Sequence, residues 1–129
     1  TTGTPWIPEG RSYKEVNAEK AVKDSNSIFN HYKKLIELRK EYDVISKGNI
    51  KMILESHKKV IAYVRRYENK VLVVLNNFYG ESTKVNIPSD ILNECINSNI
   101  ILSNYSDSGK LGEEIILRPY ESIAYYIEK

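Results

Sequence analysis

The longest periodic stretch of the chain runs from Ser27 to Asp43. Large side chains recur there at spacings of three and four residues, which is the repeat of an α-helix with one apolar face. The stripe follows Ile28, Tyr32, Leu35, Arg39 and Tyr42, and it is widened by Phe29, Ile36 and Leu38. One helix cannot bury such a face by itself. We therefore expect it to pack on another part of the protein.

The residues after this helix form short alternating runs of apolar and polar side chains, which are typical of β-strands. Asn69 lies in a three-residue link and favours a hairpin there, because Asn tolerates the left-handed conformation of a tight turn. Residues 71–75 are apolar on both faces, which predicts a central strand. About seven strands are predicted, at 49–55, 60–67, 71–78, 82–87, 99–104, 113–118 and 121–128. This spacing predicts an antiparallel β-sandwich in a mainly β, α+β protein with one amphipathic helix.

The first 26 residues show neither the helical nor the strand period. Prolines and glycines stand there among polar residues, which predicts an extended loop. Trp6 and Ile7 are the large apolar pair near its start, and we expect them to pin it. A short helical turn is predicted around residues 18–22. A segment of this length without regular structure is often a functional loop or the torn edge of a larger domain.

Length, charge and cysteine content exclude several classes of protein. The 129 residues are about half of a typical (β/α)8 barrel. The formal net charge is +2 and the lysines are scattered among glutamates, which argues against a nucleic-acid partner. Cys95 has no partner for an internal disulfide, which indicates a reducing, cytoplasmic compartment. No apolar run approaches the roughly 20 residues of a membrane span, so no membrane partner is expected.

Candidate catalytic or metal-binding groups are few. His31 and His57 stand far from other ligand types, so no metal or cofactor site is predicted. Glu113 and Glu114 are neighbours on a predicted strand and point to opposite faces, so they cannot act as a glycosidase carboxylate pair. Most of the tyrosines in the predicted strands are explained by packing rather than by sugar stacking. The residues alone therefore predict no catalytic site.

Seven runs, taken together and in order, resemble one enzyme family. They are TTGTPWIP (1–8), YKEVNAEKAV (13–22), DSNSIFNHYKKLIELRK (24–40), VIAYVRRY (60–67), VLVVLNNF (71–78), ILSNY (101–105) and LRPYES (117–122). They are similar to the C-terminal part of glycoside hydrolase family 13, the alpha-amylase family, in its oligo-1,6-glucosidase group. In that family a catalytic (β/α)8 barrel is followed by a β-sandwich.

The resemblance implies a fragment of a retaining α-glucosidase. Residues 1–45 would be the last loop and helix of the barrel, and residues 46–129 the C-terminal β-sandwich. The family's three catalytic carboxylates have no counterpart here, so the chain itself would be inactive. Its partner would be the catalytic barrel of the same parent chain, and an oligosaccharide would bind only to the intact enzyme.

The loop after Ile7 departs from the family pattern. Relatives usually carry VNPNY there, whereas this chain has PEGRSY at 8–13 and keeps only Tyr13. The loop borders the substrate entrance in the family, so the resemblance implies entrance residues at Trp6, Arg11 and Tyr13. Trehalose-6-phosphate hydrolases belong to the same group, and Arg11 could meet a phosphate there. The alternative interpretation of Arg11 is a solvated loop residue.

Two further hypotheses remain open. A carbohydrate-binding β-sandwich module would need two or three exposed, coplanar aromatic rings on one face. A structural or interaction domain would dock its helix on another protein. The fragment hypothesis accounts for both the unpaired helix and the irregular N-terminal segment. For the isolated chain it predicts that the helix packs on its own sandwich or that the chain self-associates.

Overall fold

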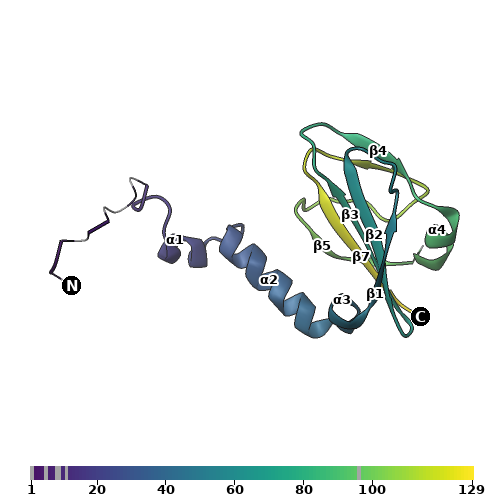
Figure 1. Ribbon diagram of the computed structural model, residues 1–129, viewed down its shortest axis with the longest axis horizontal. Helices are drawn as coiled ribbons and strands as arrows, with labels where there is room; N and C mark the ends of the chain where they lie inside the picture. Colours follow the sequence, from purple (N-terminus) through teal and green to yellow (C-terminus); the bar gives the residue numbers. More distant parts are fainter. Residues whose placement is uncertain (1, 5, 8–9, 11, 96) are drawn as a thin grey trace. The chain divides into compact units, whose positions relative to one another are not determined.

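The computed structural model of the protein describes residues 2–4, 6–7, 10, 12–95 and 97–129. The chain divides into two compact units, Thr1–Glu41 and Tyr42–Lys129. Each unit has its own elements and its own internal contacts (Figure 1).

The described residues of the N-terminal unit form two helices, α1 (Ala18–Lys23) and α2 (Ile28–Glu41). Helix α1 confirms the short helical turn predicted at this place. Helix α2 lies within the predicted range and begins after Ser27, whose Oγ accepts a hydrogen bond of 3.2 Å from the backbone N–H of Asn30. That bond satisfies one of the free amides at the helix start.

The loop between α1 and α2 is held by local hydrogen bonds. The Asn30 side-chain amide donates to the carbonyl oxygens of Ala21 at 3.1 Å and Asp24 at 2.7 Å. Ser27 Oγ also donates to the Ala21 carbonyl. The expected pinning of the N-terminal loop is wrong, because the Trp6 side chain is 93% exposed and Ile7 is also exposed.

The prediction of a single helix is incomplete. The C-terminal unit adds α3 (Asp43–Lys47) and α4 (Ser89–Cys95). Helix α3 is fixed by Arg65 on the sheet, whose guanidinium donates to the carbonyl oxygens of Val44 at 3.0 Å and Gly48 at 2.7 Å. The Val44 carbonyl also accepts the Gly48 N–H at 3.2 Å at the end of the helix, so Arg65 adds a second bond to it and ties the helix end to the sheet. Helix α4 buries Ile91 and Cys95, one turn apart, against the core.

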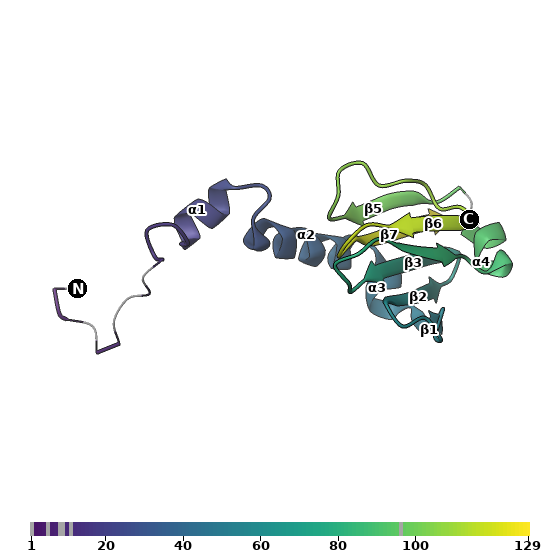
Figure 2. The ribbon, with the colours of Figure 1, turned by 90° about the horizontal axis from the view of Figure 1, so that it is seen from above.

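Seven strands are present in the described residues of the C-terminal unit, as predicted. They are β1 (Asn49–Ile53), β2 (Val60–Tyr67), β3 (Lys70–Asn77), β4 (Thr83–Asn86), β5 (Asn99–Ser103), β6 (Glu114–Leu117) and β7 (Ser122–Glu128). The antiparallel order β1-β2-β3-β7-β5 forms the larger sheet, and β4 pairs with β6. Figure 2 shows α4 at one end of these strands. The predicted antiparallel β-sandwich is confirmed.

Strand β3 lies in the centre of the large sheet, between β2 and β7. Its side chains alternate between two clusters. Val73 and Leu75 belong to the main core between the sheets, whereas Leu72 and Val74 join Val44 of α3 on the other face. The prediction of a central strand buried on both faces is therefore confirmed.

The hairpin between β2 and β3 is present, but its strained residue is not the predicted one. Tyr67 pairs directly with Lys70, so Glu68 and Asn69 form a two-residue loop. The positive φ falls on Glu68, at 54°, rather than on Asn69. Asn69 instead binds Lys129, donating from its side-chain amide at 2.8 Å to the Lys129 carbonyl and accepting from the Lys129 N–H at 3.0 Å.

In the described ranges, no helix has both the length and the apolar character to cross a bilayer.

Candidate functional site

The most densely bonded polar site of the C-terminal unit is the turn that joins β6 to β7, residues 118–121. The Glu121 N–H donates to the Arg118 carbonyl at 3.1 Å, which closes the turn. Tyr120 has a φ of 55°, in the left-handed region. This conformation costs a residue with a side chain roughly 1–2 kcal/mol. Such a backbone persists only where its surroundings hold it.

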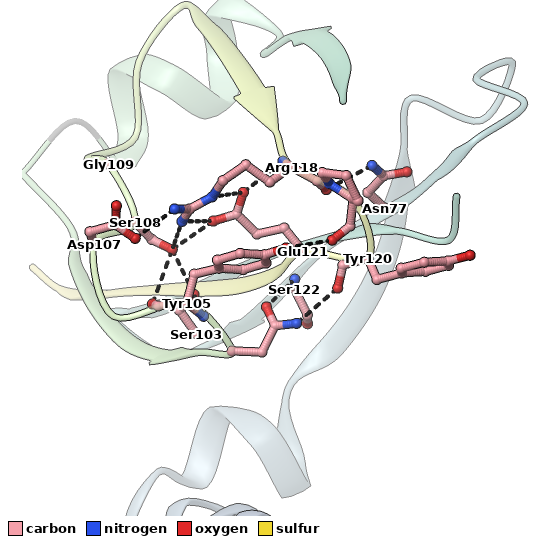
Figure 3. Close-up of polar contacts among 12 residues, drawn as sticks. Asn77, Ser103, Tyr105, Asp107, Ser108, Gly109, Arg118, Tyr120, Glu121 and Ser122 are labelled. Carbon is pink, nitrogen blue, oxygen red and sulfur yellow. Dashed lines mark hydrogen bonds and ion pairs between the residues drawn. The ribbon is translucent and has the colours of Figure 1, made fainter. Parts of the chain in front are cut away.

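The surroundings do hold it, because each of the four carbonyl oxygens of the turn accepts a hydrogen bond from another segment. The four bonds are Asn77 Nδ2 to Arg118 at 2.9 Å, Tyr105 Oη to Pro119 at 2.9 Å, Asn104 Nδ2 to Tyr120 at 2.9 Å and the Asn77 N–H to Glu121 at 2.8 Å. The donors come from the end of β3 and from the loop after β5. The turn is therefore fixed by two separate parts of the chain (Figure 3).

An ion pair with a buried carboxylate lies within this turn. The Glu121 side chain is 2% exposed, and its carboxylate accepts from Arg118 Nη2 at 2.7 Å, Arg118 Nε at 3.1 Å and the Arg118 backbone N–H at 2.8 Å. Ser108 Oγ donates to the same carboxylate at 2.7 Å. Burial by itself raises the pKa of Glu121, but the bonds from Arg118 and Ser108 outweigh it and hold this pKa below its ordinary value. The carboxylate is therefore ionised at neutral pH.

The Arg118 guanidinium connects this pair to the loop between β5 and β6. It binds Asp107 at 2.5 Å and lies 3.9 Å from the centre of the Tyr105 ring. The hydrogen bond from Arg118 lowers the pKa of the Asp107 carboxyl. Ser103 and Ser108 share a further hydrogen bond of 2.6 Å. The network thus fastens a loop of otherwise irregular structure to the start of β7 (Figure 3).

A cleft of about 270 Å³ opens beside the network. Its charged walls include Asp107, Arg118 and Glu121, which are already bound to one another. These groups are consequently engaged in holding the fold rather than poised for proton transfer. Within the described parts of the chain, no cluster of His, Cys, Asp and Glu has the arrangement of a metal site.

Two other candidate groups have structural roles. His57 Nδ1 accepts hydrogen bonds from the backbone N–H groups of Lys59 at 3.2 Å and Val60 at 3.1 Å, which closes the turn before β2. Cys95 is buried in the main core, and burial raises its pKa to about 11. It is therefore a thiol rather than a reactive thiolate at neutral pH.

The entrance residues expected from the family resemblance belong to the N-terminal unit. Trp6 and Tyr13 are both exposed there. The Tyr13 N–H donates to the Gly10 carbonyl at 3.1 Å. Among the described residues, no hydrogen bond or ring contact joins Trp6 to Tyr13, and Arg11 lies outside the described residues. The entrance role of these three residues stays a prediction.

Sequence reasoning missed the ion-pair network. Arg118 and Glu121 are opposite charges three residues apart, and they flank Pro119 and Tyr120 between two predicted strands. That spacing was the available signal, because a turn brings residues three apart close together. The partners of the pair on other loops leave no local trace in the sequence.

Models of two known protein domains match successive parts of the chain. A model described as the alpha-amylase SusG C-terminal domain matches residues 60–124, and a model described as the alpha amylase catalytic domain matches residues 1–48. The first match covers half of the chain.

Two enzymes of known name are similar to nearly the whole chain. The trehalose-6-phosphate hydrolase of Bacillus subtilis (strain 168) is 42% identical over 100% of this chain and 23% of its own length. The oligo-1,6-glucosidase of Halalkalibacterium halodurans is 42% identical over 97% of this chain and 22% of its own length. The chain thus spans less than a quarter of these relatives.

Solved structures agree with the fold. The crystal structure of the Bacillus licheniformis trehalose-6-phosphate hydrolase superposes with a TM-score of 0.87 at 44% identity, over 100% of this chain and 23% of that one. The trehalulose synthase MutB from Pseudomonas mesoacidophila MX-45 has a TM-score of 0.81 at 26% identity, over 99% of this chain and 23% of that one. The matched family models and these relatives together place the chain in the alpha-amylase family, glycoside hydrolase family 13.

Proposed function

We propose that this chain is the non-catalytic C-terminal region of a retaining α-glucosidase of the oligo-1,6-glucosidase type. The observation that carries the proposal is the match of two family models in succession, catalytic domain at 1–48 and C-terminal domain at 60–124. We assign residues 1–45 to the end of a catalytic barrel and residues 46–129 to a β-sandwich that supports it.

The apolar face of α2 supports a barrel as its partner. Ile28, Phe29, Tyr32 and Ile36 are all exposed on this helix. A helix with such a face requires an apolar surface to cover it. In the parent protein that surface is the rest of the barrel, which also carries the two close carboxylates of a retaining glycosidase.

The substrate we propose for the parent is an oligosaccharide with α-glucosidic bonds. Relatives named oligo-1,6-glucosidase or probable oligo-1,6-glucosidase are between 32% and 42% identical to this chain over nearly its whole length. We place the parent protein in the cytoplasm, because the one cysteine in the chain is a free, buried thiol.

The second candidate function is trehalose-6-phosphate hydrolysis. It is favoured by relatives of that name at 42% and 44% identity. In this case Arg11 binds the substrate phosphate in the intact enzyme. Arg11→Ala should then weaken hydrolysis of a phosphorylated disaccharide more than that of its unphosphorylated counterpart. Equal loss on both substrates would contradict the phosphate role.

The test of the main proposal is hydrolysis of a chromogenic α-glucoside by this chain and by the intact gene product, measured side by side. We expect turnover by the intact protein alone. Removal of residues 46–129 from the intact protein should lower its melting temperature, because the barrel loses its support. Turnover by the isolated chain would overturn the proposal.

A further inference from the structure

Three exposed aromatic residues lie on two neighbouring loops, where β3 ends and β7 begins. Phe78 is 60% exposed, Tyr79 is 47% exposed and Tyr120 is 64% exposed. The Tyr120 N–H donates to the Tyr79 carbonyl at 3.0 Å, so the two loops are directly joined. We call these three residues the aromatic platform. Most aromatic side chains of a stable fold are at least partly buried, so a joined group of exposed ones indicates a binding surface.

The Tyr120 ring lies close against the backbone of Gly80. A Cβ atom at Gly80 would be 3.0 Å from the Tyr120 hydroxyl oxygen and 3.4 Å from two ring carbons. A side chain at position 80 would therefore displace the ring. The absence of a side chain lets the Tyr120 ring lie against the loop that carries Phe78 and Tyr79, so the platform draws on both loops.

The backbone beneath the platform is held in place. The Phe78 N–H donates to the Lys59 carbonyl at 3.0 Å, and the Tyr79 N–H donates to Asn77 Oδ1 at 3.1 Å. Tyr120 belongs to the fixed turn of residues 118–121, and its ring points away from the ion pair of that turn (Figure 3). Rigid aromatic side chains lose little conformational entropy when a ligand covers them.

A charged pair borders the platform and limits what can bind. The Lys59 ammonium lies 5.9 Å from the centre of the Tyr79 ring and forms an ion pair with Glu81. The pair has no net charge, so it favours neither an anion nor a cation. A purely apolar partner would desolvate the pair at a cost. A neutral ligand with apolar faces and hydroxyl edges meets both requirements, because the rings cover its faces while Lys59 and Glu81 bind its hydroxyls.

We propose that the aromatic platform binds the pyranose rings of a neutral α-linked glucooligosaccharide. The choice of α-linked glucose rests on the proposed function of the parent. An oligosaccharide bound at this site stays at the enzyme, which raises the substrate concentration near the barrel.

The direct test is titration of the 129-residue chain with isomaltotriose and with maltotriose, followed by NMR. Tyr120→Gly removes the ring and suits the positive φ at this position. We expect saturable binding by the unchanged chain and an affinity about tenfold lower for Tyr120→Gly and for Tyr79→Ala. Tyr32→Ala is the matched control, because Tyr32 is 63% exposed on α2, and it should leave the affinity unchanged.

Two outcomes would overturn the proposal. One is the absence of saturable binding by the unchanged chain. The other is a loss of affinity that is the same for Tyr32→Ala as for Tyr120→Gly. Thermal unfolding of each variant shows that it is folded. This assay needs no hydrolysis, so it can fail while the intact protein still turns over a glucoside, and the reverse can also occur.

The intact protein tests whether the barrel, rather than a sugar, covers the platform. Under our proposal, Tyr120→Gly raises KM for a trisaccharide and leaves KM for a small chromogenic glucoside unchanged. If both KM values stay unchanged while Tyr120→Gly and Tyr79→Ala lower the melting temperature, the platform is a domain interface. That result would also overturn the proposal.

Discussion

Each of the two units is stabilised by its own internal contacts, and the sequence range of these contacts differs between the units. In the N-terminal unit, the side-chain amide of Asn30 bonds only to residues three to nine positions away. In the C-terminal unit, Asn77 bonds to Arg118, 41 positions away, and the core gathers side chains from both sheets. Long-range contacts make a unit fold cooperatively, because no part of it is stable alone. The N-terminal unit instead exposes large apolar side chains on α2, so we expect it to be less stable by itself.

The largest difference in stability between the units is expected when each is produced as a separate fragment. We expect residues 42–129 to unfold in one cooperative transition. Residues 1–41 should lose most of their helix, because isolated helices shorter than about 12–15 residues are marginal in water. Circular dichroism of both fragments measures this. A stable, fully helical fragment 1–41 would show that the comparison between the units is wrong.

The second largest difference between the units should be seen in the unfolding free energy when one isoleucine in each unit is truncated to alanine. Ile123 is buried in the main core, so Ile123→Ala should lower the free energy of unfolding by about 2–5 kcal/mol. Ile36 is exposed on α2, so Ile36→Ala should change it by no more than about 0.5 kcal/mol. Urea denaturation of both variants is the measurement. Similar losses would mean that α2 is already buried in the isolated chain.

The third comparison uses one ion pair from each unit. Glu121→Gln leaves Arg118 facing an uncharged amide in a buried network, which should cost about 1–3 kcal/mol. Glu19 pairs with Lys23 on the surface of α1, so Glu19→Gln should cost no more than about 0.5 kcal/mol. Both variants keep the size of the side chain. Equal losses would mean that burial of the Glu121 pair adds nothing.

The pH dependence of stability should follow the same buried carboxylate. The pKa of Glu121 is lowered in the folded protein from an ordinary value of 4.5. As the pH falls, Glu121 therefore becomes protonated in the unfolded chain at a higher pH than in the folded protein. The contribution of Glu121 is therefore complete above pH 4.5 and is lost as the pH falls through the folded pKa. Between pH 5 and pH 3 the unchanged chain should lose more stability than Glu121→Gln. Parallel curves would exclude a lowered pKa.

The smallest expected effect is the difference in stability between glycine and alanine variants at two exposed tyrosines. At the positive φ of Tyr120, Tyr120→Gly should be more stable than Tyr120→Ala by about 0.5–1 kcal/mol. On helix α2 the sign reverses, and Tyr32→Gly should be less stable than Tyr32→Ala by up to about 1 kcal/mol. Thermal unfolding of the four variants measures both differences. The same sign at both positions would contradict the left-handed conformation of Tyr120.

The strands were predictable because alternation of side chains is a local property of a sheet. In the predicted strand 82–87, apolar and polar side chains alternate, and the structure buries Thr83 and Val85 and exposes Lys84. Helices α3 and α4 were missed because runs of 5 and 7 residues are too short to display a helical period. The left-handed residue of the hairpin was misplaced because two-residue loops allow more than one turn type.

The site was less predictable than the fold. Tyr125 alternates with Ala124 and Tyr126 in the predicted strand 121–128 and is buried, whereas Tyr120 is exposed in the turn before it and lies close to Gly80. Arg118 and Glu121 are close in sequence, but their bonds to Asp107 and Ser108 arise only from the folded chain. Short-range patterns define which face of a strand is buried, and tertiary contacts define which side chains form a site.

The central position of β3 constrains the order in which the protein can be completed on the ribosome. Strand β3 pairs on one side with β2, which precedes it directly, and on the other with β7, which is synthesised about 50 residues later. Until β7 emerges, the nascent chain carries an open apolar strand edge, the kind of surface that joins other unfinished chains. A pause in translation between these two strands therefore prolongs exposure of this edge, and we expect chaperones to act in that interval.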